Sequence, residues 1–247
     1  MKKRFKVDVR SQPVRARLRY LAIAQLALVS VAGCRQPVDT AARRELAAAH
    51  SLSLESPDRA IETLNDLQSR FPDWAEPHVH AGRLYAIEGK PEEAILALTR
   101  GIELAPESRQ AALWYSRIAV ATGDNATLER AREVLERQLG QDSGDVRLYH
   151  ALGLLLEASG DVTGALGAYR MGTERLPETA RLHLDAARIF YRLGLTGRAA
   201  KRAAAARDLS EAAGGPVYEA ALRLTAQIDG GTPAARRPKA GADGGGL

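Results

Sequence analysis

Histidine and cysteine are the residue types with which this chain could do metal or nucleophilic chemistry, and both are scarce. Cys34 is the only cysteine of the 247 residues, so a disulfide or a thiolate metal site within one chain is not possible. Of the five histidines, only His78 and His80 are close in sequence, and two residues apart on a helix they point to different faces. The sequence has no His-Glu-x-x-His pair, no phosphate-binding glycine loop and no Gly-x-Ser-x-Gly elbow. We therefore expect no enzyme, no cofactor or metal site and no small-molecule substrate.

The lone cysteine follows a segment with the features of an export signal. Eight basic residues precede a short apolar stretch at residues 21–32, which as a helix spans about 18 Å, too little for a hydrocarbon core of roughly 30 Å. The stretch ends in Val-Ala-Gly-Cys, which resembles a bacterial lipobox. The resemblance implies a lipoprotein signal peptide at 1–33, a lipid on Cys34 and a tether at 34–40. Arg35 after the cysteine then implies an outer-membrane lipoprotein of the cell envelope, facing the periplasm.

The charge of the chain is concentrated in the same leader. Eight of the 35 basic residues and one of the 30 acidic residues lie in residues 1–33, which leaves 27 basic and 29 acidic residues for the rest. After removal of the leader, the protein is therefore nearly neutral. This balance lacks the basic excess that a nucleic-acid-binding protein needs, and we expect no nucleic-acid partner.

Small residues recur at a fixed spacing through most of the remaining chain. The glycines that begin with Gly89 are separated by 34, 37 and 34 residues, and the alanines that begin with Ala60 by 34, 37, 34 and 34. The third unit thus holds three extra residues, located between Gly123 and Ala131. Aromatic residues make up only 5% of the chain and helix formers dominate, so the repeated unit is expected to be helical.

The residues at these positions resemble those of the tetratricopeptide repeat (TPR) family. In one unit Gly153 occupies the small slot of the first helix, Gly160 the turn, Ala165 the second helix and Pro177 the end. The resemblance implies an all-α, right-handed superhelix, or α-solenoid, of five helical hairpins. The expected units are 41–74, 75–108, 109–145, 146–179 and 180–213.

Each of these residue types has a physical reason. A small residue lets two helices approach, a glycine allows a left-handed turn, and a proline cannot continue a helix. A single hairpin cannot bury its apolar stripe alone, so the last one requires a cover, which we expect from a capping helix at 214–228. Residues 229–247 are rich in Gly, Ala and Pro, and we expect a disordered tail there.

In the TPR family the first helices of the repeats line a concave, partner-binding groove. The slot after the small packing residue holds arginine in three of five units, and arginine can bind a carboxylate through two parallel hydrogen bonds. Such a row predicts binding to protein or peptide segments, including acidic ones. The expected groove residues are Val79, Arg83, Leu113, Arg117, His150, Leu154, Leu184, Arg188 and Tyr191.

The sequence therefore favours a membrane-anchored TPR scaffold or adaptor that binds other proteins. We expect it to assist the assembly or localisation of a cell-envelope complex, such as a pilus, a secretion system or an envelope-biogenesis machine. One alternative is a cytoplasmic TPR scaffold whose start has been assigned wrongly. Another is an envelope enzyme or its regulatory subunit. Incorporation of palmitate at Cys34 separates the first alternative from the leading hypothesis.

Overall fold

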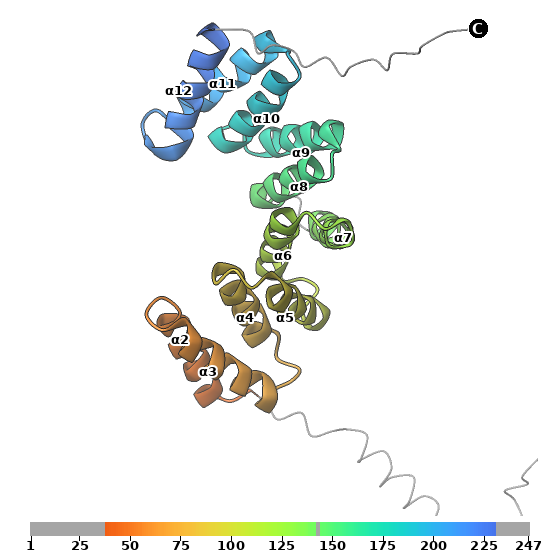
Figure 1. The fold of residues 1–247 in the computed structure, drawn as a ribbon, viewed down its shortest axis with the longest axis vertical. Coiled ribbons are helices and arrows are strands. Elements are labelled where there is room, and N and C mark those ends of the chain that lie inside the picture. Colours follow the sequence, from red (N-terminus) through yellow and green to blue (C-terminus); the bar gives the residue numbers. More distant parts are fainter. Residues whose placement is uncertain (1–37, 142–143, 231–247) are drawn as a thin grey trace, which may run out of the picture.

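A computed structural model describes residues 38–141 and 144–230 (Figure 1). The signal peptide expected at 1–33, the expected lipidation site Cys34, most of the expected tether at 34–40 and nearly all of the expected tail lie outside the described residues. Within the described residues there are eleven helices and no strand, and the prediction of an all-α solenoid is confirmed. None of the described helices is both long and apolar enough to span a bilayer.

The helices pair into five antiparallel hairpins, followed by a single helix that covers the last pair. Each second helix also packs against the first helix of the next hairpin, which produces the elongated stack of Figure 1. The first helices are α2 (Thr40–Leu52), α4 (Ala75–Ile87), α6 (Arg109–Thr122), α8 (Val146–Ala158) and α10 (Ala180–Arg192). The second helices are α3 (Pro57–Arg70), α5 (Pro91–Leu104), α7 (Asn125–Gln141), α9 (Val162–Arg175) and α11 (Thr196–Ser210), and the covering helix is α12 (Gly215–Gly230).

Small residues allow the two helices of a hairpin to pack closely, as the sequence predicts. A Cβ atom added to Gly82 would lie 2.5 Å from Cγ of Leu98, and one added to Gly153 would lie 2.1 Å from Cε1 of Tyr169. Neither glycine could carry a side chain unless its partner moved. The close packing of α4 on α5 and of α8 on α9 depends on these two contacts.

The ends of the helices follow local rules. Gly160 has a φ of 85°, a left-handed conformation that favours glycine, and closely precedes the start of α9. The side chain of Asp161 then accepts a hydrogen bond from the backbone N–H of Gly164 at 2.8 Å, which caps α9. At its other end, α9 stops at Arg175, two residues before Pro177. These signals fix where α9 begins and ends.

Candidate peptide-binding face

Two of the residues expected in the groove are not available there. Val79 is only 4% exposed and packs against Gly101, where an added Cβ would lie 2.7 Å from its Cγ2. Leu184 is fully buried against α11 and α12, in a cluster that includes Ala203 and Leu224. Both residues lie four residues, or about one turn, before an arginine of the row, and their side chains point about 40° away from the direction of that arginine around the helix axis. Val79 and Leu184 therefore face the neighbouring helices, and the prediction that they line the groove is wrong.

The three arginines of the predicted row have different surroundings. Arg83 donates from Nη2 to Nδ1 of His50 at 3.0 Å. The guanidinium of Arg117 lies over the ring of Trp114, 5.1 Å from its centroid, in a cation–π contact. Arg188 donates from Nη1 to Oδ1 of Asp185 at 3.0 Å. The three arginines therefore differ in how many of their N–H groups remain available to a partner protein.

Three of the expected groove residues, Leu154, Arg188 and Tyr191, come together in one hollow. It has a volume of about 460 Å³ and lies between α8, α10 and α12. We call it the concave pocket. Its other lining residues are Glu157, Arg181, Asp185, Arg192, Ala220, Arg223, Leu224 and Gln227. The remaining expected groove residues do not line it: Leu113 packs half-buried against the core at α6, and His150 of α8 contacts Asp185 of the pocket without lining it.

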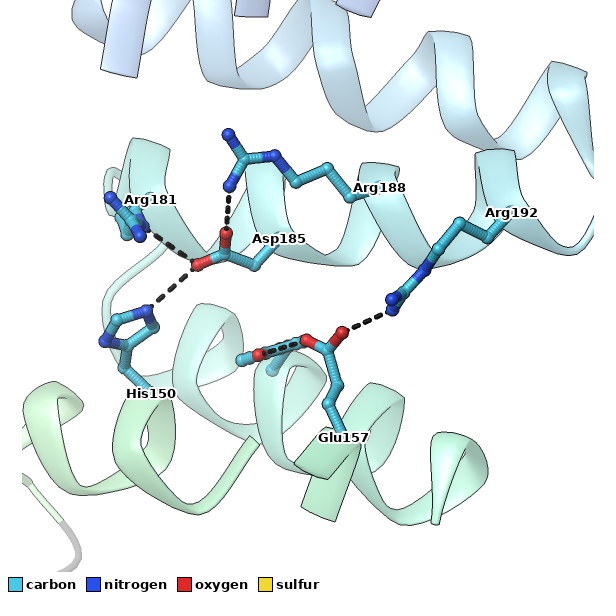
Figure 2. A network of polar contacts seen from close by, with 7 residues as sticks. His150, Glu157, Arg181, Asp185, Arg188 and Arg192 are labelled. Carbon is cyan, nitrogen blue, oxygen red and sulfur yellow. Dashed lines mark hydrogen bonds and ion pairs between the residues drawn. The ribbon is translucent and has the colours of Figure 1, made fainter. Parts of the chain in front are cut away.

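Asp185 organises the wall of the concave pocket (Figure 2). The residue is 3% exposed, and its carboxylate accepts hydrogen bonds from Nε2 of His150 at 2.9 Å, Nε of Arg181 at 3.0 Å and Nη1 of Arg188 at 3.0 Å. Burial alone would raise the pKa of Asp185, but the hydrogen bond from His150 and the charge of Arg181 outweigh it and hold the pKa below its usual value. The carboxylate is thus a fixed negative charge that orients two arginines.

Glu157 of α8 likewise holds an arginine of α10 in place. Its carboxylate accepts a hydrogen bond from the hydroxyl of Tyr169 at 2.7 Å. Figure 2 shows that it also pairs with Arg192. Tyr169 is fully buried, and burial together with the nearby Glu157 raises the pKa of its hydroxyl, so the hydroxyl stays protonated and donates. Arg192 is therefore held across the space between α8 and α10.

The concave pocket carries a net positive charge. Four arginines line it against two carboxylates, and among the described residues Arg223 has no hydrogen-bonding or ion-pairing partner. Arg188 and Arg192 each keep further N–H groups that are not used by Asp185 or Glu157. The pocket can therefore bind a carboxylate, while Leu154 and Tyr191 offer apolar contact.

Sequence reasoning missed most of the polar residues of this pocket. Arg181, Asp185, Arg188 and Arg192 follow one another at intervals of four, three and four residues, which is the spacing of one helical face. Extending the arginine slot along α10 would have found them. Glu157 and Arg223 could not be found in this way, because they reach the pocket from α8 and α12.

A second polar cluster lies at the other end of the concave face. The rings of His50 and His80 pack edge to face with centroids 5.5 Å apart, next to Arg83. Nδ1 of His80 and Nε of Arg83 are buried without a hydrogen-bonding partner among the described residues. Burial, and then the charge of Arg83, lower the pKa of His80 to about 4, so the imidazole is neutral at pH 7. In the described part of the chain, no group of three or more His, Cys, Asp or Glu side chains is placed to hold a metal ion.

Comparisons with known proteins agree with this geometry. The family model for the TPR domain of cytochrome c-type biogenesis protein H matches residues 65–182. MamA from Desulfovibrio magneticus RS-1 is 18% identical with a TM-score of 0.62, covering 71% of this chain and 98% of its own. YrrB, described as a TPR protein with an unusual peptide-binding site, is 18% identical with a TM-score of 0.57, covering 72% and 89%. TTC0263, a thermophilic TPR protein from Thermus thermophilus, is 17% identical with a TM-score of 0.56, covering 76% and 97%. No curated protein sequence matches the chain.

A stack of helical hairpins with a polar concave face defines a class of protein-binding scaffolds. Within that class, the family model matches the central part of the chain, and the solved TPR structures share its fold. Residues 65–182 thus match a TPR domain, and the described part of the chain has the fold of a TPR scaffold for protein–protein interaction.

Proposed function

We propose that this protein is a membrane-tethered adaptor that captures acidic segments of partner proteins on its concave face. By doing so it helps to assemble or localise a complex of the cell envelope. The observation that supports this role is the concave pocket, where Arg188, Arg192 and Arg223 converge beside Leu154 and Tyr191. The leader and the Val-Ala-Gly-Cys sequence ending at Cys34 support the tether.

The chemistry of the concave pocket favours an acidic segment over a neutral one. A neutral peptide would leave the spare N–H groups of Arg188 and Arg192, and the unpaired charge of Arg223, without compensation. The carboxylates of an acidic segment would supply acceptors for these groups. The matching family model, drawn from a biogenesis protein, is a precedent for a TPR domain in an assembly role.

The experiment compares partners captured by the wild type and by a variant with three uncharged concave positions. Arg117→Gln, Arg188→Gln and Arg223→Gln remove three cations from this face while leaving Asp185 its hydrogen bonds from His150 and Arg181. Crosslinking in intact cells followed by mass spectrometry identifies the partner with the wild type. We expect the triple variant to bind that partner about tenfold more weakly, because each exposed ion pair contributes about 0.2–1 kcal/mol.

A matched control removes three exposed cations from second helices, Arg59→Gln, Arg137→Gln and Arg175→Gln, and should bind normally. Equal capture by the triple variant and the wild type would refute a role for the concave arginines. The tether is tested separately with radiolabelled palmitate and Cys34→Ser. Labelling that persists in Cys34→Ser, or is absent from the wild type, would refute the lipid anchor and favour the cytoplasmic alternative.

A further inference from the structure

The outer side of the last complete hairpin carries two adjoining hollows that the concave pocket does not include. One has a volume of about 320 Å³ and lies between α9, α10 and α11, and the other has a volume of about 530 Å³ and lies between α10 and α11. Phe190 and Arg202 line both, so the two hollows form one continuous depression. We call it the outer groove.

The outer groove and the concave pocket lie on different faces of α10. Arg188 lines the concave pocket and Phe190 lines the outer groove, and two residues on a helix are about 200° apart. His183, Ala186 and Phe190 repeat at intervals of three and four residues and so form one stripe. A molecule bound in the outer groove would therefore not compete with one bound in the concave pocket.

Positive charge is concentrated along the outer groove. Arg198, Lys201 and Arg202 lie on one face of α11, three and four residues apart. The guanidinium of Arg198 lies over the ring of Phe190, 5.9 Å from its centroid, and Lys201 has no hydrogen-bonding or ion-pairing partner in the described part of the chain. No acidic residue lines either hollow among the residues the structure describes. The charge of these three cations is thus not compensated by a neighbouring carboxylate, unlike that of Arg188 in the concave pocket.

One of these cations is held in place by a chain of hydrogen bonds. Arg202 donates from Nη1 to Nδ1 of His183 at 3.0 Å, and Nε2 of His183 donates to the carbonyl oxygen of Pro177 at 3.0 Å. His183 accepts at one ring nitrogen and donates at the other, so it is the neutral tautomer that orients Arg202. The remaining N–H groups of Arg202 stay available to a ligand.

The floor of the outer groove is apolar. Leu166, Ala186 and Phe190 line it between the cations of α11 and Arg170 of α9, whose guanidinium reaches Glu174 at 3.6 Å. A cationic rim around an apolar floor complements a segment that carries carboxylates on both sides of a bulky apolar side chain. A bare phosphate would leave the apolar floor exposed to water.

We propose that the outer groove is a second docking surface, which binds an acidic protein segment containing a bulky apolar side chain. The partner is a different molecule and not a terminal segment of this chain. Residues 1–33 carry eight basic residues and one acidic residue, and residues 231–247 carry three and one, so both segments would be repelled. With the concave pocket, the outer groove would let one molecule of this adaptor hold two partners.

The test uses a fluorescein-labelled peptide of alternating Asp and Glu around one central Phe, and measures its binding to the full chain by fluorescence anisotropy. We expect Arg198→Gln with Lys201→Gln to weaken binding by about fivefold, because two exposed ion pairs are lost. The matched control, Arg59→Gln with Arg137→Gln, should bind as the wild type does. A second probe with Ser in place of Phe should bind the wild type more weakly, a result that does not depend on any variant folding.

The outcomes separate the possible occupants. Equal binding by the wild type and the Arg198→Gln, Lys201→Gln variant would overturn the proposal, as would an equal loss in the control. Binding to phosphatidylglycerol vesicles that exceeds binding to the peptide, and is lost in the same variant, would assign the groove to a membrane surface instead. Self-association in sedimentation velocity that the variant abolishes would assign it to a second copy. The concave pocket would bind the same acidic probe, so every protein compared in this test, including the reference, also carries Arg117→Gln, Arg188→Gln and Arg223→Gln. The result is then independent of the test of the concave pocket.

Discussion

The same substitution, glycine to alanine, should have opposite effects at two helical positions of one hairpin. In the interior of a helix this change normally stabilises the folded protein by about 0.5–1 kcal/mol, since alanine loses less backbone freedom on folding than glycine does. At Gly167 of α9 an added Cβ meets nothing within 4 Å, so Gly167→Ala should show that gain. At Gly153 of α8 the added Cβ would lie 2.1, 2.6 and 2.6 Å from three atoms of the Tyr169 ring.

The cost at Gly153 outweighs the gain. Carbon atoms in ordinary contact are about 3.5–4.0 Å apart, so the buried Tyr169 ring must move by more than about 1 Å, and overpacking of this kind costs about 1–3 kcal/mol. We take the upper part of that range because the ring is fully enclosed. The net effect of Gly153→Ala is then a loss of about 1–2 kcal/mol.

Thermal unfolding followed by circular dichroism measures both variants. For a chain of this size, about 1 kcal/mol corresponds to about 2–4 °C in Tm, so Gly153→Ala should lower Tm by about 2–8 °C and Gly167→Ala should raise it by about 1–4 °C. Displacing Tyr169 also removes its hydrogen bond to Glu157, the partner of Arg192, so Gly153→Ala should weaken capture at the concave pocket. A Tm for Gly153→Ala equal to or above that of the wild type would refute the packing argument.

Two further predictions concern ionisable groups. The pKa of His80 falls from 6.5 to about 4 on folding, so the unfolded chain takes up the proton first, and stability that is complete above about pH 6.5 should decrease as the pH falls towards 4. Allowing for the partial exposure of His80, we expect the free energy of unfolding to fall by about 1–2 kcal/mol, measured by urea unfolding at several pH values. If His80→Gln had the same dependence of stability on pH as the wild type, this prediction would be contradicted. Asp185→Asn should lower the free energy of unfolding by about 1–2 kcal/mol, because Arg181 and Arg188 lose their buried counter-charge but remain half-exposed to water. An unchanged midpoint of urea unfolding would show that the network adds nothing to stability.

The fold could be predicted because its determinants are local and repeated. The turn at Gly160 depends on one residue, and the close approach at Gly153 on a small residue whose position the 34-residue period fixes. The three extra residues of the third unit are also found where the spacing places them. They extend α7 to 17 residues, compared with 14 in α5 and α9. Both α7 and α9 begin two residues after the turn glycine, but Ala131 comes three residues later in α7 than Ala165 does in α9, so the extra residues lie in the N-terminal part of α7.

The site could be predicted only in part, since side chains on one helix must be completed by residues from others. The spacing places Arg188 and Tyr191 on the groove side of α10, and both line the concave pocket, but it does not show that Asp185 has already paired with Arg188. That pairing requires Asp185 to be buried between α8 and α10, which is a property of the stack. Val79 fails for a related reason, because its contact with Gly101 on the second helix, and not its apolar character, decides which face it occupies.

The two cationic surfaces of α10 differ in how their charges are held, and this difference predicts how each would bind. On the concave face, Asp185 and Glu157 fix Arg188 and Arg192 before any partner arrives, so little side-chain freedom is lost on binding. In the outer groove only Arg202 is held, through His183, while Lys201 must lose its freedom when a partner binds. Attraction there rests on exposed charge, which salt screens within about 10 Å at an ionic strength of about 0.1 M. Binding in the outer groove should therefore weaken more steeply with added salt than binding in the concave pocket, where partly buried pairs are screened less.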